Sequence, residues 1–222
     1  MSYVQVDNLV KQYGDGESAV QAVKRIDLRI QSGEMVAIMG ESGSGKSTLL
    51  SMMGALNTPT SGRYIVDDID VYALGQDERA DFRRNFLGFV FQSFHLVSYL
   101  TVAENVMLPL VIAKTNGKKK RTVAEEALAR VSLGGKGKRL PNQISGGEQE
   151  RVAIARAIVN KPPILLADEP TGNLDTKTSE EIMLLLKGLN ADGMTIIMVT
   201  HNPMNAQFAH RIIRLKDGQV AE

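Results

Sequence analysis

The sequence predicts one α/β domain with three parts: a parallel-sheet core, an N-terminal antiparallel β lobe and an inserted helical lobe. Residues 3–36 alternate in polarity as strands do and are interrupted by glycine-containing turns. Later apolar runs alternate with helix-forming segments, which is typical of a parallel sheet. The pattern between Gln92 and about Asn160 is instead mainly helical. The expected division of the single domain 1–222 is a core with its β lobe over 1–92 and 161–222, and a helical lobe over 93–160.

Composition limits the class of protein. The chain has 222 residues, of which 43% are hydrophobic and 23% charged, so it can bury a substantial core. Its net charge of +1 gives no global field for nucleic acid, and we expect no nucleic-acid partner. The absence of cysteine excludes disulfides and thiolate metal sites and fits a reducing compartment. No secretion-signal pattern opens the chain, and no apolar stretch approaches the ~20 residues that span a bilayer. Membrane association would therefore require a partner.

A glycine-rich loop at residues 40–48 has the pattern G-x-x-x-x-G-K-[ST]. It lies between an apolar run, 35–39, and a helix-forming run, 47–55, which is the strand–loop–helix setting of a P-loop nucleotide-binding core. The glycines let successive N–H groups cradle phosphate oxygens, Lys46 adds a positive charge, and the Ser47 hydroxyl can ligate Mg²⁺. The expected nucleotide-binding residues here are Gly40, Ser42, Gly43, Ser44, Gly45, Lys46, Ser47 and Thr48.

Two carboxylates follow a second buried-strand run. Residues 164–167 are apolar and end in Asp168 and Glu169, which places both carboxylates at a strand end, where open parallel sheets bind ligands. Asp168 is suited to hold Mg²⁺ through water, and Glu169 to accept a proton from an attacking water. The plainer alternative is a solvated acidic turn.

A second candidate anion site precedes this strand. Ser145 and Glu148 form a capping-box pattern at the start of a helix with an apolar side. Gly146 and Gly147 weaken the first helical turn but leave bare N–H groups beside a hydroxyl and a positive helix end. The alternative is only a well-capped helix. Two phosphate-facing loops in one chain need an explanation.

These motifs, in this order, resemble the nucleotide-binding subunit of an ATP-binding-cassette (ABC) transporter. The likeness runs from Tyr13 through the glycine-rich loop, Gln92, the Ser145-Gly146-Gly147 signature and Asp168-Glu169 to residues 173–175 and His201. In that family the signature of one protomer faces the ATP held by the other, so the resemblance implies a head-to-tail dimer with two buried nucleotides. It also implies ATP and Mg²⁺ as cofactors and an integral membrane permease as partner, with the subunit peripheral on the cytoplasmic face of the membrane.

The resemblance assigns roles to four further residues. It implies that Tyr13 stacks on adenine, Gln92 senses Mg²⁺ or the attacking water, Asp175 communicates across the dimer, and His201 contacts the γ-phosphate. Taken alone, Tyr13 could equally be a packing residue and His201 a capping one. Gln92 and His201 both follow apolar strand runs, which would bring them to the ligand edge of the sheet. Glu169, His201, Gln92 and Lys46 are thus the expected catalytic residues, and Ser47, Gln92 and Asp168 the expected metal ligands.

Within the family, segments 88–94, 100–106 and 170–175 look most like the lipoprotein-releasing and macrolide-exporter subgroup, so we expect an ATPase that drives a membrane partner in export or extraction. A regulatory cassette of the cell-division type, which signals without transport, would use identical motifs and stays an alternative. Two departures stand out. Glu150 occupies a position where the family commonly has a second Gln, and the segment 132–139 is richer in Gly and Lys than the usual linker.

Three other features have open interpretations. The basic run Lys118–Arg121 is expected to be a solvated loop before a helix over 122–131, or else a contact for anionic lipid. Residues 134–138 look like a flexible link, and His95 and His210 like surface residues. The apolar residues from Phe94 to Leu100 are either lobe core or an exposed surface that receives a helix of the membrane partner.

Overall fold

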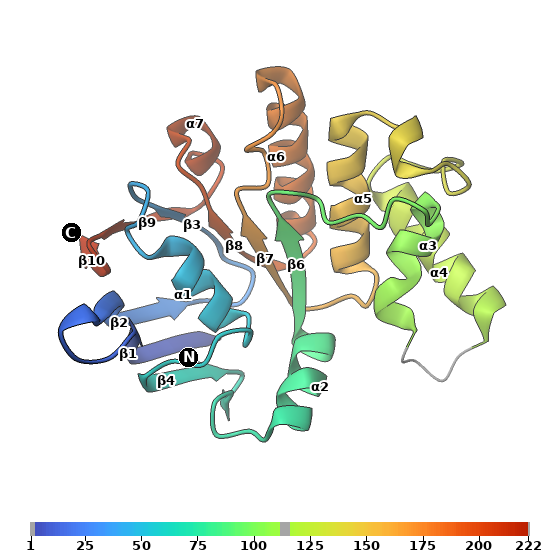
Figure 1. The fold of residues 1–222 in the computed structure, drawn as a ribbon. Coiled ribbons are helices and arrows are strands. Elements are labelled where there is room, and N and C mark those ends of the chain that lie inside the picture. Colours follow the sequence, from blue (N-terminus) through green and yellow to red (C-terminus); the bar gives the residue numbers. More distant parts are fainter. Residues whose placement is uncertain (1–2, 112–115, 222) are drawn as a thin grey trace.

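The computed structural model describes residues 3–111 and 116–221, and it shows two sheets with helices packed around them (Figure 1). The strands in these residues are β1 (Val4–Tyr13), β2 (Val20–Ile30), β3 (Met35–Met39), β4 (Ser61–Val66), β5 (Ile69–Asp70), β6 (Leu87–Phe91), β7 (Ile164–Asp168), β8 (Thr195–Val199), β9 (Arg211–Lys216) and β10 (Gln219–Ala221). The α-helices are α1 (Lys46–Met53), α2 (Gln76–Phe86), α3 (Val102–Met107), α4 (Gly117–Arg130), α5 (Gly146–Ile158), α6 (Thr176–Ala191) and α7 (Pro203–Ala206). Short 3₁₀ turns occur at Gly16–Ser18, Leu108–Leu110 and Pro141–Gln143.

The central sheet has the strand order β10-β9-β3-β8-β7-β6, and β6, β7, β8, β3 and β9 pair in parallel. Successive residues of its inner strands enter opposite cores. Met35 and Ala37 face the core shared with α5 and α6, whereas Val36 and Ile38 face the core shared with α1 and the β lobe. Burial on both faces explains why these strands read as unbroken apolar runs. The predicted parallel sheet is confirmed.

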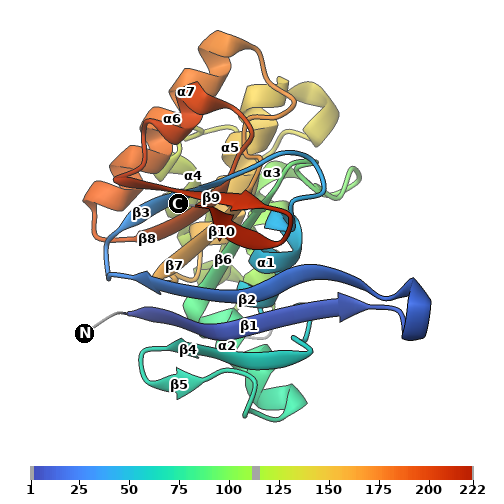
Figure 2. The same cartoon turned by 90° about the vertical axis from the view of Figure 1, so that its left-hand side faces the viewer.

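The β lobe is an antiparallel sheet of order β2-β1-β4-β5 that lies beneath the central sheet in Figure 2. Helix α1 packs between the two sheets, and its Leu49, Leu50, Met52 and Met53 are buried in the same core as the lobe. Both ends of the glycine-rich loop are therefore anchored by apolar packing. The predicted antiparallel lobe is confirmed.

The helical lobe consists of α3, α4 and α5, which pack against one another beside β6 (Figure 1). Val152, Ile154 and Ala155 of α5 join α3 and α4 in the core on the face of the central sheet opposite the β lobe. No helix in the described residues is long and apolar enough to cross a bilayer.

Two predictions about this lobe are wrong. The basic run Lys118–Arg121 is not a loop, because α4 begins at Gly117: the Asn116 side chain caps the helix by accepting from Lys119 N at 2.9 Å. Residues 134–138 are not a free link either. They form turns in which the Gly137 carbonyl, like that of the following Arg139, accepts from one of the first N–H groups of α3, and Lys136 forms an ion pair with Glu148.

Glu150 is an unpaired carboxylate in the middle of α5. Its side chain is 0% exposed, and within the described part of the chain neither carboxylate oxygen has a hydrogen-bond partner. Burial raises the pKa of Glu150 to about 8, although the positive charge of Arg156 opposes the rise. Between the ordinary glutamate pKa of 4.5 and this raised value, Glu150 keeps its proton in the folded chain but loses it in the unfolded chain.

We expect Glu150→Gln to stabilise the protein increasingly as pH rises. The folded pKa lies above the ordinary glutamate value of 4.5, so wild-type stability falls between ~pH 5 and ~pH 8, by at most about 1.4 kcal/mol per pH unit. Denaturant unfolding at several pH values measures this difference. Glu126→Gln on α4, an exposed carboxylate, controls for the lost charge. A constant difference between wild type and Glu150→Gln across the window would contradict the buried titration.

Candidate functional site

The glycine-rich loop connects β3 to α1 and takes a conformation that needs glycine. Gly43 and Gly45 have φ of 79° and 97°, in the left-handed region. A methyl group on Gly40 would collide with the carbonyl of Leu215 on β9, and one on Gly45 with the carbonyl of Ala22 on β2. The loop is thus pressed against a strand of each sheet, with the N-terminus of α1 beneath it.

Lys46 folds back onto this loop. Its ammonium donates to the carbonyls of Gly40 at 2.8 Å and Glu41 at 2.7 Å, and the residue is only 8% exposed. The positive charge is therefore held at the mouth of the loop by weak, exchangeable partners rather than by a carboxylate. An anion seated on the loop N–H groups would compete for it directly.

The carboxyl end of β7 faces the loop. Asp168 accepts a hydrogen bond from the Ser47 hydroxyl at 3.3 Å. Burial raises the pKa of Asp168, with the Ser47 hydrogen bond opposing the rise. A hydroxyl and a carboxylate side by side are the oxygen ligands that Mg²⁺ prefers, and a cation there would favour the ionised carboxylate.

Glu169 and His201 form a pair at the neighbouring strand ends. The His201 Nδ1 atom lies 2.8 Å from Glu169 Oε1, and Glu169 itself has a left-handed φ of 49° fixed by its N–H bond to Val199 O. This strained backbone turns a mostly buried carboxylate toward the loop.

One cavity of about 490 Å³ brings most predicted residues together. Its lining includes Gly40, Ser42, Gly43, Gly45, Lys46, Ser47, Thr48, Gln92, Glu169 and His201. Ser44, which belongs to the same loop, is buried. Glycine N–H groups, one ammonium, hydroxyls and the Glu169 carboxylate converge on the carboxyl edge of a parallel sheet, and Asp168 lies beside them, bonded to Ser47. This is the arrangement expected for a nucleoside triphosphate.

The remaining predicted residues lie elsewhere. Ser145 caps α5 through Glu148 N at 3.3 Å, and Asp175 caps α6 through Thr178 N at 3.0 Å. The two caps are neighbours, since a side chain on Gly147 would collide with Thr178. None of Ser145, Gly146, Gly147 or Asp175 lines the loop cavity, and α5 lies on the far side of β6 from α1 (Figure 1).

Tyr13 also stands outside the loop cavity, at the end of β1. It is 46% exposed, its hydroxyl accepts from Asn57 Nδ2 at 2.6 Å, and the Lys11 ammonium lies 5.0 Å from its ring centroid. One ring face is therefore taken by a cation in this conformation.

The segment from Phe94 to Leu100 divides between the two predicted roles. Leu96 packs against the core, whereas Tyr99 is 81% exposed. The buried Asn105 side chain holds the segment by bonding Val97 and Leu100 backbone groups. His95 and His210 are exposed, as expected.

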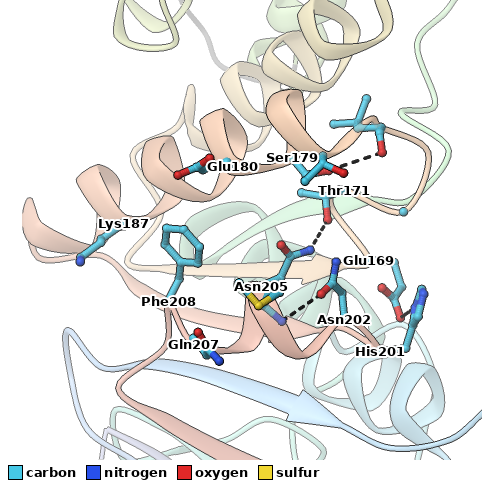
Figure 3. Close-up of a pocket in the computed structure, with 14 residues that line it drawn as sticks. Glu169, Thr171, Ser179, Glu180, Lys187, His201, Asn202, Asn205, Gln207 and Phe208 are labelled. Carbon is cyan, nitrogen blue, oxygen red and sulfur yellow. Dashed lines mark hydrogen bonds and ion pairs between the residues drawn. The ribbon is translucent and has the colours of Figure 1, made fainter.

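A second cavity, of about 600 Å³, was missed by sequence reasoning (Figure 3). Figure 3 shows Glu169 and His201 at one end and Lys187 and Phe208 at the other. Asn205 donates to Thr171 across its floor at 2.6 Å. The Asn202-Pro203 pair is typical of a helix N-terminus, and Asn202 accepts from Met204 N at 2.9 Å. Nothing in the sequence, however, indicates a cavity at this helix.

Fold and site together define a P-loop nucleoside-triphosphatase cassette. The sequence profile of the ABC transporter family matches residues 23–172. The uncharacterized ABC transporter ATP-binding protein MJ0796 of Methanocaldococcus jannaschii is 49% identical over 222 residues, covering 98% of this chain and 94% of that one. The chain belongs to the ABC transporter family and is an ATP-binding ATPase subunit of it.

Two further comparisons extend this likeness. The macrolide export ATP-binding/permease protein MacB of Salmonella choleraesuis is 48% identical over 213 residues, which are 96% of this chain and 33% of MacB. The dimeric structure of a post-hydrolysis state of the cassette MJ0796, bound to ADP and Pi, superposes with a TM-score of 0.90 at 48% identity, covering 99% of this chain and 97% of that one. The predicted fold and family are thereby confirmed.

The glycine contacts lead to a test of the loop. We expect Gly45→Ala to destabilise the chain by about 1–3 kcal/mol more than Gly43→Ala, because both need a left-handed backbone but only Gly45 also faces a carbonyl, that of Ala22. Denaturant unfolding without nucleotide measures both variants. Equal losses would show that the contact with β2 does not constrain the loop.

Proposed function

We propose that the chain hydrolyses ATP at the loop cavity, with Mg²⁺ held by Ser47 and Asp168 and with Gln92 at the same edge. The observation that carries this assignment is the convergence of the glycine-rich loop, Lys46 and Glu169 on one cavity, with Asp168 hydrogen-bonded to the Ser47 hydroxyl that lines it. Lys46 leaves the Gly40 and Glu41 carbonyls for the phosphates, and Ser47 and Asp168 supply oxygen ligands. When bound, Mg²⁺ neutralises phosphate charge.

Glu169 is the base in this proposal. Its carboxylate is oriented by the left-handed backbone and by His201, so it can take a proton from water in line with the γ-phosphate. His201 is exposed beside it and can turn its free ring nitrogen to the phosphate. Tyr13 is proposed as the adenine platform, which requires the Lys11 ammonium to leave its ring.

The complete site is proposed to need two copies of the chain. Ser145, Gly146 and Gly147 lie outside the loop cavity, and among the described residues the N–H groups of Gly146 and Gly147 make no hydrogen bond. Free N–H groups at a helix start bind anions. Seating them on the partner's γ-phosphate, with Asp175 beside them, gives a head-to-tail dimer; the cassette MJ0796 is dimeric.

The membrane partner is proposed to be a permease. Driving such a partner requires one part of the domain to move against another. MacB carries ATP-binding and permease parts in one chain, and the present chain spans about a third of it. We propose a cassette peripheral to the cytoplasmic face of the membrane, with residues 93–160 as the lobe that moves against the core formed by 1–92 and 161–222. Export or extraction is favoured over signalling by the MacB likeness.

Replacing the base tests the chemistry. We expect Glu169→Gln to slow hydrolysis by on the order of 10²–10⁴ while ATP binding persists, because the shape is retained and the proton acceptor is lost. An ATP-bound dimer should accumulate in sedimentation runs. Phosphate release and nucleotide affinity are measured on the same preparation, and turnover close to that of wild type would reject Glu169 as base.

A second pair of variants separates the two anion sites. We expect Lys46→Ala to weaken ATP binding to the isolated chain, and Ser145→Arg to leave that binding intact while preventing the nucleotide-dependent dimer, because Ser145 does not line the loop cavity. Equilibrium binding and sedimentation are compared for both. If Ser145→Arg removes binding by the monomer, the signature belongs to the same protomer's site.

A further inference from the structure

The turns at residues 133–139 hold one lysine beside the first turn of α5. Leu133 is buried in the lobe core, and its carbonyl accepts from Lys136 N at 3.1 Å. The carbonyl of the next residue, Gly137, accepts from Ala103 N of α3 at 3.0 Å. The backbone of Lys136 is thus fixed both by its own turn and by a neighbouring helix, so its side chain extends from a defined place.

The Lys136 ammonium forms an ion pair with Oε1 of Glu148, the third residue of α5. The other carboxylate oxygen, Oε2, accepts from Ser145 N at 2.8 Å, and the Ser145 hydroxyl accepts from Glu148 N at 3.3 Å. The hydrogen bond from Lys136 is the largest cause that holds the pKa of Glu148 below its usual range. Glu148 is therefore ionised at neutral pH, and Lys136 is the one cation in ion-pair contact with it among the described residues.

A charged Glu148 opposes the proposed function of the signature. The N–H groups of Gly146 and Gly147 are proposed to meet a partner's γ-phosphate, and Glu148 belongs to the same helical turn. Like charges at close range repel strongly where water is excluded. The carboxylate also accepts from Ser145 N, so it uses part of the positive helix end to which an anion would bind. Without a counter-charge, Glu148 would weaken the binding of a phosphate at the signature.

We propose that Lys136 is a positioning residue that neutralises Glu148, so that the signature can accept the triphosphate of a nucleotide held by a second copy of the chain. This inference rests on the proposed function, which seats the signature on a partner's nucleotide. Lys136 acts through the carboxylate: it cancels the charge and holds Oε2 on Ser145 N. Glu148 can then cap α5 without repelling the ligand.

The substitution Glu148→Gln separates the charge from the cap. The side-chain oxygen of glutamine can accept from Ser145 N as the carboxylate does, so the capping box is retained. The wild-type pair and the double variant Lys136→Ala, Glu148→Gln therefore carry the same local charge. Lys136→Ala alone leaves one negative charge at the signature, and Glu148→Gln alone leaves one positive charge.

The test measures the ATP-dependent dimer in chains that all carry Glu169→Gln. We expect Lys136→Ala to weaken this dimer by about tenfold at low salt, because the Glu148 charge then faces the phosphate alone. Adding Glu148→Gln to Lys136→Ala should restore the dimer to within about twofold of the parent chain. Glu148→Gln alone should dimerise at least as tightly as the parent. Sedimentation at several protein concentrations gives each dissociation constant.

Two matched variants and two conditions control for other effects. Lys136→Arg keeps the charge and should keep the dimer, and Lys138→Ala removes an exposed lysine of the same turns and should leave the dimer unchanged. Higher salt should reduce the loss in Lys136→Ala to about two- or threefold, because it screens the repulsion. ATP affinity of the monomer should not change, since Lys136 does not line the loop cavity. The melting temperature should fall by no more than about 4 °C.

A double variant whose dimer is as weak as that of Lys136→Ala would overturn the proposal, because Lys136 would then contact the nucleotide itself or only stabilise the lobe. An undiminished dimer in Lys136→Ala, or an equal loss in Lys138→Ala, would overturn it too. If the parent Glu169→Gln chain forms no ATP-dependent dimer, the proposed two-copy site fails together with the role of Lys136. A dimer that forms but does not respond to Lys136→Ala rejects the role of Lys136 alone, so the two failures are distinguishable.

Discussion

The position of the phosphate loop depends on two backbone contacts that only glycine allows. Gly40 lies against the Leu215 carbonyl of β9, and Gly45 against the Ala22 carbonyl of β2. The turn after β9 completes the attachment, because Gly218 N donates to Ser44 O at 3.1 Å while Gly218 O accepts from Lys24 N at 2.7 Å. One loop is thus fixed to both sheets. Its N–H groups can face an anion because the strands behind it prevent the loop from collapsing onto itself.

Helix α5 connects the other functional parts. Its 13 residues span roughly 20 Å, with the signature at one end and Arg156 near the other. Its middle is fixed in the lobe core by Val152, Ile154 and Ala155. A helix packed in this way moves as a unit, so a displacement at Arg156 also moves the signature at the other end of the helix. Glu150 of this same helix lowers the stability of the folded chain as pH rises from ~5 to ~8, since it is buried with no hydrogen-bond partner among the described residues.

Much of the fold and most of the loop cavity could be predicted, because they depend on local patterns. The apolar runs at 35–39 and 164–167 are buried on both faces of a parallel sheet, and burial on both faces selects apolar residues at every position. The Ser145 capping box likewise forms within four residues of sequence. Features that depend on residues distant in the sequence could not be predicted from it. The order of residues 134–138 comes from α3, and the ring of Tyr13 is occupied by Lys11 through strand geometry.

The role of Arg156 shows the same limit more clearly. In sequence it is one cation in an amphipathic helix, yet its guanidinium holds the carbonyls of Phe94 and His95, some sixty residues earlier. Those residues take left-handed backbone angles that cost free energy in non-glycine residues. The cost is sustained because a half-buried guanidinium needs acceptors, and the two carbonyls supply them in place of a carboxylate. The backbone strain after Gln92 is therefore sustained by the same two hydrogen bonds that satisfy the Arg156 guanidinium.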